Sequence, residues 1–296
     1  MDMESVDMTT VRSEVRAKCQ NKLLAVSEVV LVYTSVVGLM WISELIPGFE
    51  SWQKANFGRA ILSISCYLGL TGVLMFYLHG LRNTPNIFSD NAIKKALKNG
   101  GKSLLIMFLA TFGFPVAQSL GFGVTDWGGA VIIGHFYLAA TLIVLWMLKG
   151  EQTVEESSFS KSDARTAGWI FLGGIALIAV LHQVNAIARD ILIALVFVGF
   201  AEEFLFRGYM QSRLNMAFGK PFEFLNLNFG WGIIIASALF GLAHVISPGE
   251  NPMQWSWGFW TFCAGLGFGV IREKGGSFLA PAVVHGVTMI IPVVFS

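Results

Sequence analysis

The stretch "GFAEEFLFRGYM", residues 199–210, places three charged side chains inside a run that is otherwise almost entirely apolar. Within a membrane span, an ionisable group costs several kcal/mol unless it faces a polar cavity or a partner. Glu203 and Arg207 are four residues apart, so on a helix they share a face and can form an ion pair. Glu202 is turned about 100° away, which leaves its carboxylate available. The alternative is that a helix leaves the membrane here, with all three charges near the headgroups.

The overall composition indicates that this stretch belongs to a membrane protein. Of the 296 residues, 54% are hydrophobic and 13% are charged, whereas soluble proteins have roughly 25% charged residues. The net charge of +1 indicates neither a nucleic-acid partner nor an acidic substrate. The cysteines are far apart and form no CxxC, so we expect neither a disulfide framework nor a zinc cluster from Cys19, Cys66 and Cys263.

Nine apolar runs approach the roughly 20 residues that cross a bilayer core. The sequence therefore predicts an all-α fold, a polytopic membrane protein with a bundle of eight or nine transmembrane helices. The runs are 23–46, 60–81, 103–122, 130–148, 168–182, 187–206, 229–246, 256–271 and 278–295.

The distribution of basic residues predicts the orientation in the membrane. Lys and Arg follow the second, fourth, sixth and eighth runs, whereas "ISPGENPMQW" (246–255) after the seventh has neither. The positive-inside rule then makes the even-numbered loops and the amino end cytoplasmic. The first 22 residues mix both charge signs and lack an apolar core, so we expect no cleavable signal peptide. We expect a multi-pass integral protein of the cytoplasmic membrane of a prokaryote.

The polar segment between the fourth and fifth runs divides the chain. The predicted regions are a cytoplasmic tail (1–22), a four-span membrane region (23–148), a cytoplasmic linker (149–167) and a C-terminal membrane region (168–296). Isolated polar residues outside the glutamate motif are interpreted as interhelical hydrogen bonds or as groups near the headgroups: Glu28, His79, His135 and His182.

Two histidines in later runs can share a polar site with the glutamates. "SALFGLAHVI" (237–246) places His244 four residues after Phe240, and "APAVVHGVTMI" (280–290) contains His285. A partly desolvated carboxylate can act as a general base on water. Neutral imidazoles can donate hydrogen bonds to an oxyanion or relay a proton to a leaving amine. This set predicts peptide-bond hydrolysis without a covalent intermediate.

The arrangement resembles the type II CAAX prenyl endopeptidase family and its Abi, or CPBP, relatives, which are intramembrane proteases. The family signature is EExxxR, then FxxxH, then a histidine in a later span. The matching positions, within about residues 187–295, are Glu202, Glu203, Arg207, Phe240, His244 and His285.

The resemblance also implies roles for these residues. Glu202 is the base that activates water, and Glu203 and Arg207 orient it. His244 and His285 bind the substrate carbonyl or the oxyanion. The implied substrate is a membrane protein or a lipid-anchored peptide, and the implied partner is the lipid bilayer, with no nucleic acid.

One position departs from the family pattern, which commonly has Asn four residues after the last histidine. Met289 stands there and cannot donate a hydrogen bond. Thr288 lies on nearly the same helix face, so it is expected to support the site together with Phe240. We also expect the sixth helix to continue past Arg207 towards Leu214, with "FEFLNLNFGW" (222–231) beginning the seventh outside the bilayer core. Otherwise His244 would lie about 10 Å deeper than Glu202.

Other chemistries are compatible with the same residues. A carboxylate and two histidines can bind zinc, and in a metal-dependent enzyme the ligands would be Glu202, His244 and His285. The sequence lacks HExxH, and the resemblance favours a glutamate mechanism, so no cofactor is expected. One alternative function is a catalytically silent membrane scaffold of the same fold. Another is a proton- or cation-coupled transporter, although no second copy of the glutamate motif suggests an inverted repeat.

Overall fold

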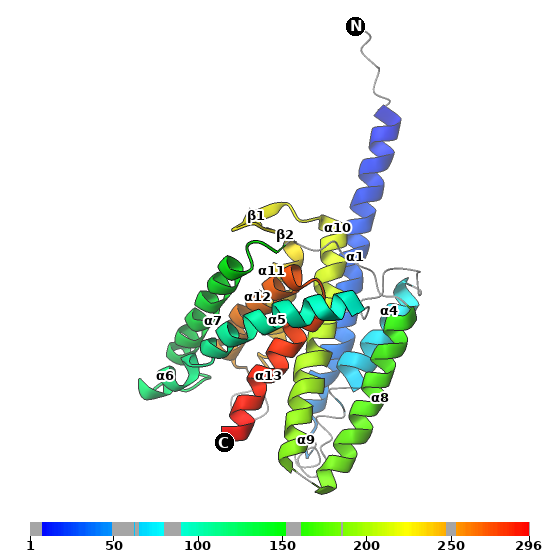
Figure 1. Ribbon diagram of the computed structural model, residues 1–296. Coiled ribbons are helices and arrows are strands. Elements are labelled where there is room, and N and C mark those ends of the chain that lie inside the picture. The colour runs from blue at the N-terminus through cyan, green and yellow to red at the C-terminus, as the bar shows by residue number, and fades with distance from the viewer. Residues whose placement is uncertain are drawn as a thin grey trace.

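The computed structural model describes residues 8–48, 62, 65–79, 90–151, 161–184, 186–246 and 253–295, and these are almost entirely helical (Figure 1). The all-α class is confirmed. The helices before residue 186 are α1 (Met8–Glu44), η1 (Ser65–Leu70), α4 (Thr71–His79), α5 (Asp90–Ala110), α6 (Gly113–Ser119), α7 (Trp127–Met147) and α8 (Lys161–Val184). After it come α9 (Ala186–Ile193), η2 (Ala194–Glu202), η3 (Phe204–Gln211), α10 (Ser212–Phe218), α11 (Trp231–Ala243), α12 (Trp255–Gly275) and α13 (Leu279–Phe295).

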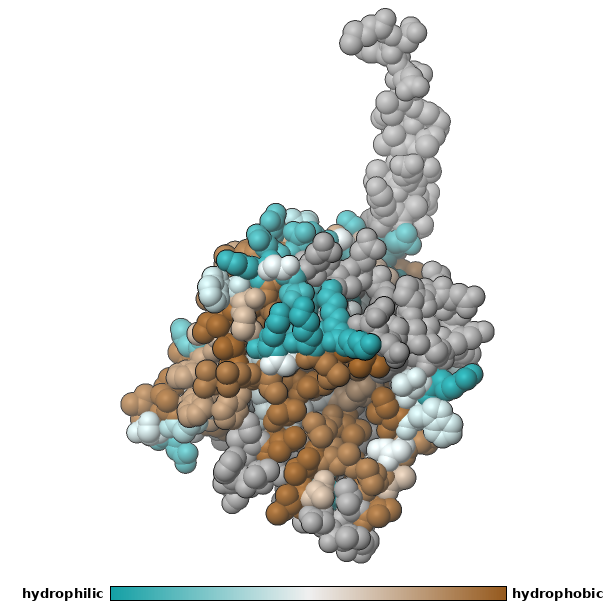
Figure 2. Space-filling view, viewed as in Figure 1, coloured by the Kyte–Doolittle hydropathy of each residue, from teal (hydrophilic) through white to brown (hydrophobic). Residues whose placement is uncertain are grey.

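Helix length and composition fit a polytopic membrane protein. In the described part of the chain, three stretches are long and apolar enough to cross a membrane: Asn21–Ser43, Ile93–Ser119 and Trp127–Met147. Shorter apolar helices cover Ser65–Met75, Gly168–Val180, Trp231–Ala243 and Leu279–Ile290. In Figure 2 hydrophilic side chains gather over α5, and the surface below them, over α13, is hydrophobic.

The sixth predicted span is part of a longer helix built from α9, η2, η3 and α10. Its middle segments, η2 and η3, are π-helical, and Glu203 between them keeps helical backbone angles. The prediction that this helix continues past Arg207 towards Leu214 is confirmed, because it ends only at Phe218. π-Helical turns occur often at functional sites, and here they contain the glutamate motif.

The segment 222–231 is a hairpin, so the prediction that it begins the seventh helix is wrong. β1 (Phe222–Phe224) pairs antiparallel with β2 (Leu227–Phe229). The two-residue turn has positive φ angles at Leu225 and Asn226, which matches the twist of paired strands. Alternating apolar residues favour strands over a helix here. The helix α11 starts at Trp231, directly after the hairpin.

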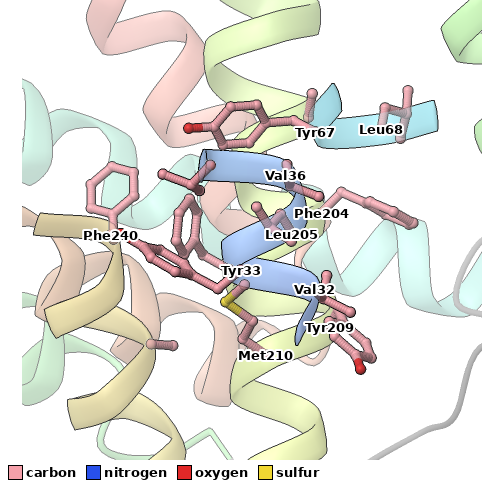
Figure 3. Packing of buried hydrophobic residues seen from close by; sticks show 14 of the residues in the cluster. Val32, Tyr33, Val36, Tyr67, Leu68, Phe204, Leu205, Tyr209, Met210 and Phe240 are labelled. Carbon is pink, nitrogen blue, oxygen red and sulfur yellow. The ribbon is translucent and has the colours of Figure 1, made fainter. Parts of the chain in front are cut away.

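Helices from before and after residue 149 share one core. α7 packs on α12, and α5 packs on α13. Figure 3 shows side chains of α1, among them Val32, Tyr33 and Val36, against Leu205 and Met210 of the long helix. The helix α1 begins at Met8, inside the predicted tail. Residues 1–7 of that tail and 152–160 of the predicted linker lie outside the described residues, so the division into regions remains a prediction.

One of the isolated polar residues, Glu28, has the interhelical contact that the sequence indicates, whereas the contact of His135 lies within its own helix. Arg213 Nε donates a hydrogen bond of 2.5 Å to Glu28 Oε2, joining α10 to α1, which confirms the interhelical interpretation. His135 is exposed, with Nδ1 at 2.7 Å from the carbonyl oxygen of Val131 on its own helix. The side chains of His79, His182 and Cys19 lie outside the described residues. Cys66 and Cys263 are free.

Gly199 allows α13 to touch the long helix backbone to backbone. A Cβ added at Gly199 would lie 2.5 Å from the carbonyl oxygen of Ala282 and 2.7 Å from Cα of Gly286. Because both neighbours are backbone atoms, Gly199→Ala is expected to destabilise the protein by about 1–3 kcal/mol. Thermal unfolding in detergent measures the effect. Gly173→Ala is the control, because a Cβ there meets no atom within 4 Å; equal changes in the two variants would contradict close packing at Gly199.

A surface ion-pair cluster after α7 predicts a pH dependence of stability. Glu151 Oε1 accepts hydrogen bonds from Lys102 Nζ at 3.0 Å and Lys98 Nζ at 3.1 Å. These bonds lower the pKa of the Glu151 carboxyl from an ordinary 4.5 to about 2. A depressed folded-state pKa stabilises the fold above the unfolded pKa, and this stabilisation disappears as the pH falls towards the folded value.

The Tm of the wild type is therefore expected to fall more than that of Glu151→Gln when the pH is lowered from 5 to 3. Differential scanning fluorimetry in detergent measures both curves. Glu223→Gln, which changes an exposed carboxyl of the hairpin, is the matched control and is expected to follow the wild type. Parallel curves for wild type and Glu151→Gln would show that the cluster does not couple protonation to stability.

Candidate active site

The centre of the candidate site is a buried network of three charged or polar side chains. Glu203 Oε1 lies 3.1 Å from Arg207 Nη1 on the next turn, which is the pair that the sequence spacing predicts. The same oxygen lies 2.9 Å from Nδ1 of His285 on α13. Glu203 and Arg207 are completely buried, and His285 is 7% exposed. Glu203 thus joins the arginine of its own helix to a histidine 82 residues away.

Aromatic rings and a glycine fix the guanidinium of Arg207. Its Cζ lies 4.5 Å from the ring centroid of Phe240 and 5.6 Å from that of Phe268, distances at which a cation is attracted to a ring face. Nη2 donates a hydrogen bond of 3.0 Å to the carbonyl oxygen of Gly265. A Cβ at Gly265 would lie 3.0 Å from this nitrogen, so the close approach uses the lack of a side chain.

His285 is held by aromatic contacts as well as by Glu203. Its imidazole stacks on Phe268 with centroids 4.4 Å apart and an interplanar angle of 23°. Phe240 meets the same imidazole edge-on at 5.8 Å. Phe240 is a supporting residue in the sequence prediction, whereas Phe268 was missed. The helical spacing of apolar residues in α12 does not single out Phe268 from the other apolar residues of this helix. Only its contact with His285 in the folded protein distinguishes it.

His244 lies at the carboxyl end of α11, next to Phe240. Its Nδ1 is 2.8 Å from the carbonyl oxygen of Phe240, and its ring centroid is 4.7 Å from that of Phe240. The indole of Trp257 on α12 lies 6.3 Å from the imidazole, centroid to centroid. Both histidines that the sequence singles out therefore border the same phenyl ring.

The hydrogen bonds of the histidines determine which nitrogen carries the proton. A carbonyl oxygen only accepts, so Nδ1 of His244 donates to Phe240, and a carboxylate likewise only accepts from Nδ1 of His285. In a neutral imidazole with a protonated Nδ1, Nε2 is an acceptor. This differs from the expectation that neutral imidazoles donate to an oxyanion, because donation from Nε2 requires the protonated ring.

Glu202 lies directly before Glu203, at the end of η2. It is 6% exposed, and its Oε2 atom is buried without a hydrogen-bond partner among the described residues. Such a buried acceptor is rare in folded proteins unless a water, an ion or a function accounts for it. Oε2 of Glu203 is likewise buried without a partner in the described part of the chain, but Oε1 of Glu203 is bonded to Arg207 and His285, so Glu203 is the carboxylate that the network holds in place.

Thr288 and Met289, three and four residues after the last histidine, have different surroundings. Thr288 is buried, and its hydroxyl donates a hydrogen bond of 2.8 Å to the carbonyl oxygen of His285. Its proton is therefore used within α13, although the oxygen can still accept. Met289 is 38% exposed. The side chain that replaces the expected Asn thus lies on the surface of the helix.

The ligands of a metal-dependent enzyme would be Glu202, His244 and His285. Within the described ranges, no three His, Cys, Asp or Glu side chains are grouped closely enough to hold a metal ion. Nδ1 of His244 and Nδ1 of His285 each lie against a protein acceptor, which leaves Nε2 as the nitrogen of each ring that could bind a metal.

A second buried polar cluster was missed by the sequence analysis. Glu273, near the end of α12, is completely buried. It accepts hydrogen bonds at 2.6–3.0 Å from Gln211, Asn215, Lys220 and Arg272. Gln211 and Asn215 connect the carboxyl end of the long helix, which carries the glutamate motif, to α12. The sequence "REK" (272–274) at the end of an apolar run could have indicated this cluster. Its basic residues were used only to predict the orientation of the protein in the membrane.

Comparison with known proteins supports the resemblance that the motifs indicate. Residues 183–291 match a family model described as Rce1-like, type II CAAX prenyl endopeptidase. No curated protein and no solved structure matches the chain. The matched range contains every residue of the Glu203 network, together with Glu202 and His244. This match supports membership of the CPBP, or Abi, family, to which the type II CAAX prenyl endopeptidases belong.

Proposed function

We propose that this protein is an intramembrane endopeptidase in which Glu202 activates a water molecule for attack on a peptide bond. Membership of the family supports a CAAX-type protease in general. The observation that carries the mechanism is the buried carboxylate oxygen of Glu202, without a partner among the described residues, beside the Glu203–Arg207–His285 network. A general base needs such an oxygen within reach of the water that it deprotonates.

The reaction proceeds in two steps through a tetrahedral intermediate. Glu202 takes a proton from water as the water oxygen bonds to the scissile carbonyl carbon, and the carbonyl oxygen becomes an oxyanion. The carbon–nitrogen bond then breaks, and the proton on Glu202 passes to the departing amine. Hydrogen-bond donors around the carbonyl oxygen stabilise the charge that develops there. One water is consumed, and no covalent enzyme intermediate forms.

Glu203 and Arg207 act through His285 in this proposal. Glu203 accepts a hydrogen bond from Nδ1 of the imidazole and so fixes the orientation of the ring. Arg207 balances the charge of Glu203 in a water-free environment. His244, fixed by Phe240, borders the same site. That Glu203 and Arg207 also orient Glu202 stays a prediction.

The proposed substrate is a membrane-associated or lipid-anchored protein or peptide, which the family description supports. With the amino end and the basic loops in the cytoplasm, the enzyme takes its substrate from the cytoplasmic leaflet of a prokaryotic membrane. A prenylated peptide ending in Cys, two aliphatic residues and a variable residue is the first substrate to test.

The experiment is cleavage of a peptide library, including prenylated members, by detergent-purified protein, with fragments identified by mass spectrometry. A parallel reaction contains a strong zinc chelator. The proposal predicts defined cleavage in both reactions. Cleavage that stops with chelator and returns with zinc would replace the glutamate mechanism by a metal-dependent one. No cleavage of any peptide would favour the silent scaffold.

A further inference from the structure

A peptide substrate needs neutral hydrogen-bond donors for its carbonyl groups, and few donors around the histidines are available. The Nδ1–H groups of His244 and His285 are used within the protein, and so is the hydroxyl proton of Thr288. Among the described residues, Arg207 has an unpartnered Nε, but its guanidinium is already bonded to Glu203 and to the carbonyl oxygen of Gly265. A donor at the edge of the site must therefore come from another residue.

Trp257 has the required properties. It lies on the first turn of α12, with its indole 6.3 Å from the imidazole of His244 and tilted by 43°. The side chain is partly exposed, yet its Nε1 atom is buried and has no hydrogen-bond partner among the described residues. An indole N–H can only donate and does not titrate in the physiological range. Its ring lies nearly parallel to that of Trp260, at 6.5 Å and 11°, and Trp260→Phe keeps an aromatic ring at that position.

We infer that Trp257 is a substrate-binding residue whose indole N–H donates a hydrogen bond to a backbone carbonyl of the peptide beside His244. This inference rests on the proposed peptidase function. The interaction supplies a neutral donor on the α12 side of the site, opposite the Glu203 network. Because the indole does not titrate, its contribution to binding is independent of pH, unlike a contribution from an imidazole.

The test replaces the indole by aromatic groups that have no N–H donor. In Trp257→3-benzothienylalanine a sulfur atom takes the place of N–H with almost the same shape, and Trp257→Phe is a second variant. The probe is the library peptide that the wild type cleaves best. Both variants are expected to lower kcat/KM by about 10-fold or more, with most of the change in KM and with the same pH profile as the wild type.

Trp260→Phe is the matched control. Trp260 lies one turn further along α12, and its buried N–H also has no partner among the described residues, but its ring contacts Phe114 and Tyr137 and neither histidine. Its kcat/KM is expected to stay within about 2-fold of the wild type, because the loss of its N–H affects no substrate contact.

The outcomes separate this inference from the proposed function. If the wild type cleaves no peptide, the proposed function fails and the inference fails with it. If the wild type cleaves but the benzothienylalanine variant stays within 2-fold, only the role of Trp257 is overturned. Equal losses in the Trp257 and Trp260 variants would assign the effect to aromatic packing and would also overturn the role.

Discussion

Glu202→Gln is expected to lower kcat by about 10²–10⁴-fold without unfolding the protein. A general base contributes an acceleration of this size, and an amide cannot take a proton from water at neutral pH. The fold is expected to persist, because Oε2 of Glu202 has no hydrogen-bond partner among the described residues. An uncharged side chain also costs less to bury than a carboxylate. Steady-state cleavage of an identified peptide and thermal unfolding of the same preparation measure the two effects.

The matched control is Glu28→Gln, which removes another buried carboxylate of the membrane region. Glu28 pairs with Arg213 between α1 and α10 and is not part of the candidate site. We expect this variant to lose stability and to keep its kcat within a few fold when rates are normalised to folded protein. A Glu202→Gln enzyme that cleaves at the wild-type rate would remove Glu202 from the mechanism.

Arg207→Met is expected to destabilise the protein by about 3–5 kcal/mol, because it leaves the negative charge of Glu203 buried without its positive partner. Both side chains of the pair are completely inaccessible to solvent. The double variant Glu203→Gln/Arg207→Met removes both charges and is expected to recover most of the loss. Chemical unfolding of the three proteins in detergent measures the free energies, and the difference between single and double variants isolates the charge pair.

A surface ion pair provides the control for this comparison. Lys98→Met breaks the contact with Glu151, in which the lysine side chain is 60% exposed, and exposed pairs contribute about 0–1 kcal/mol. If Arg207→Met were no more destabilising than Lys98→Met, the buried network would not stabilise the fold. If the double variant were as unstable as Arg207→Met alone, the loss would come from packing against Phe240 and Phe268 rather than from charge.

Local patterns in the sequence predicted the parts of the site that lie on one helix. The four-residue spacing of Glu203 and Arg207 is sufficient for their pair, because neighbouring turns of a helix bring such residues together. The continuation of the sixth helix was predicted from the depths of His244 and Glu202 in the membrane. That comparison also uses local geometry, because the rise per residue of a helix is fixed. The apolar runs predicted the helices from length and composition.

Contacts between distant segments could not be predicted in this way. Nothing in the spacing of Glu203 and His285 indicates that one oxygen of Glu203 joins Arg207 to the imidazole, because that contact depends on the packing of α13 on η2. Phe268 and Trp257 lie on an aromatic helix in which no local signal distinguishes them. The hairpin at 222–229 was misread because the depth argument was given more weight than the alternation of apolar and polar residues, which favours strands.

The most direct test of the central claim is a single turnover in H₂¹⁸O, with enzyme in excess over an identified peptide. Mass spectrometry then locates the heavy oxygen in the product and in the enzyme fragment that contains Glu202. If Glu202 activates water, one ¹⁸O enters the new carboxyl group of the product and none enters Glu202. Incorporation of ¹⁸O into Glu202 would instead show that this carboxylate attacks the peptide bond itself, and would contradict the mechanism.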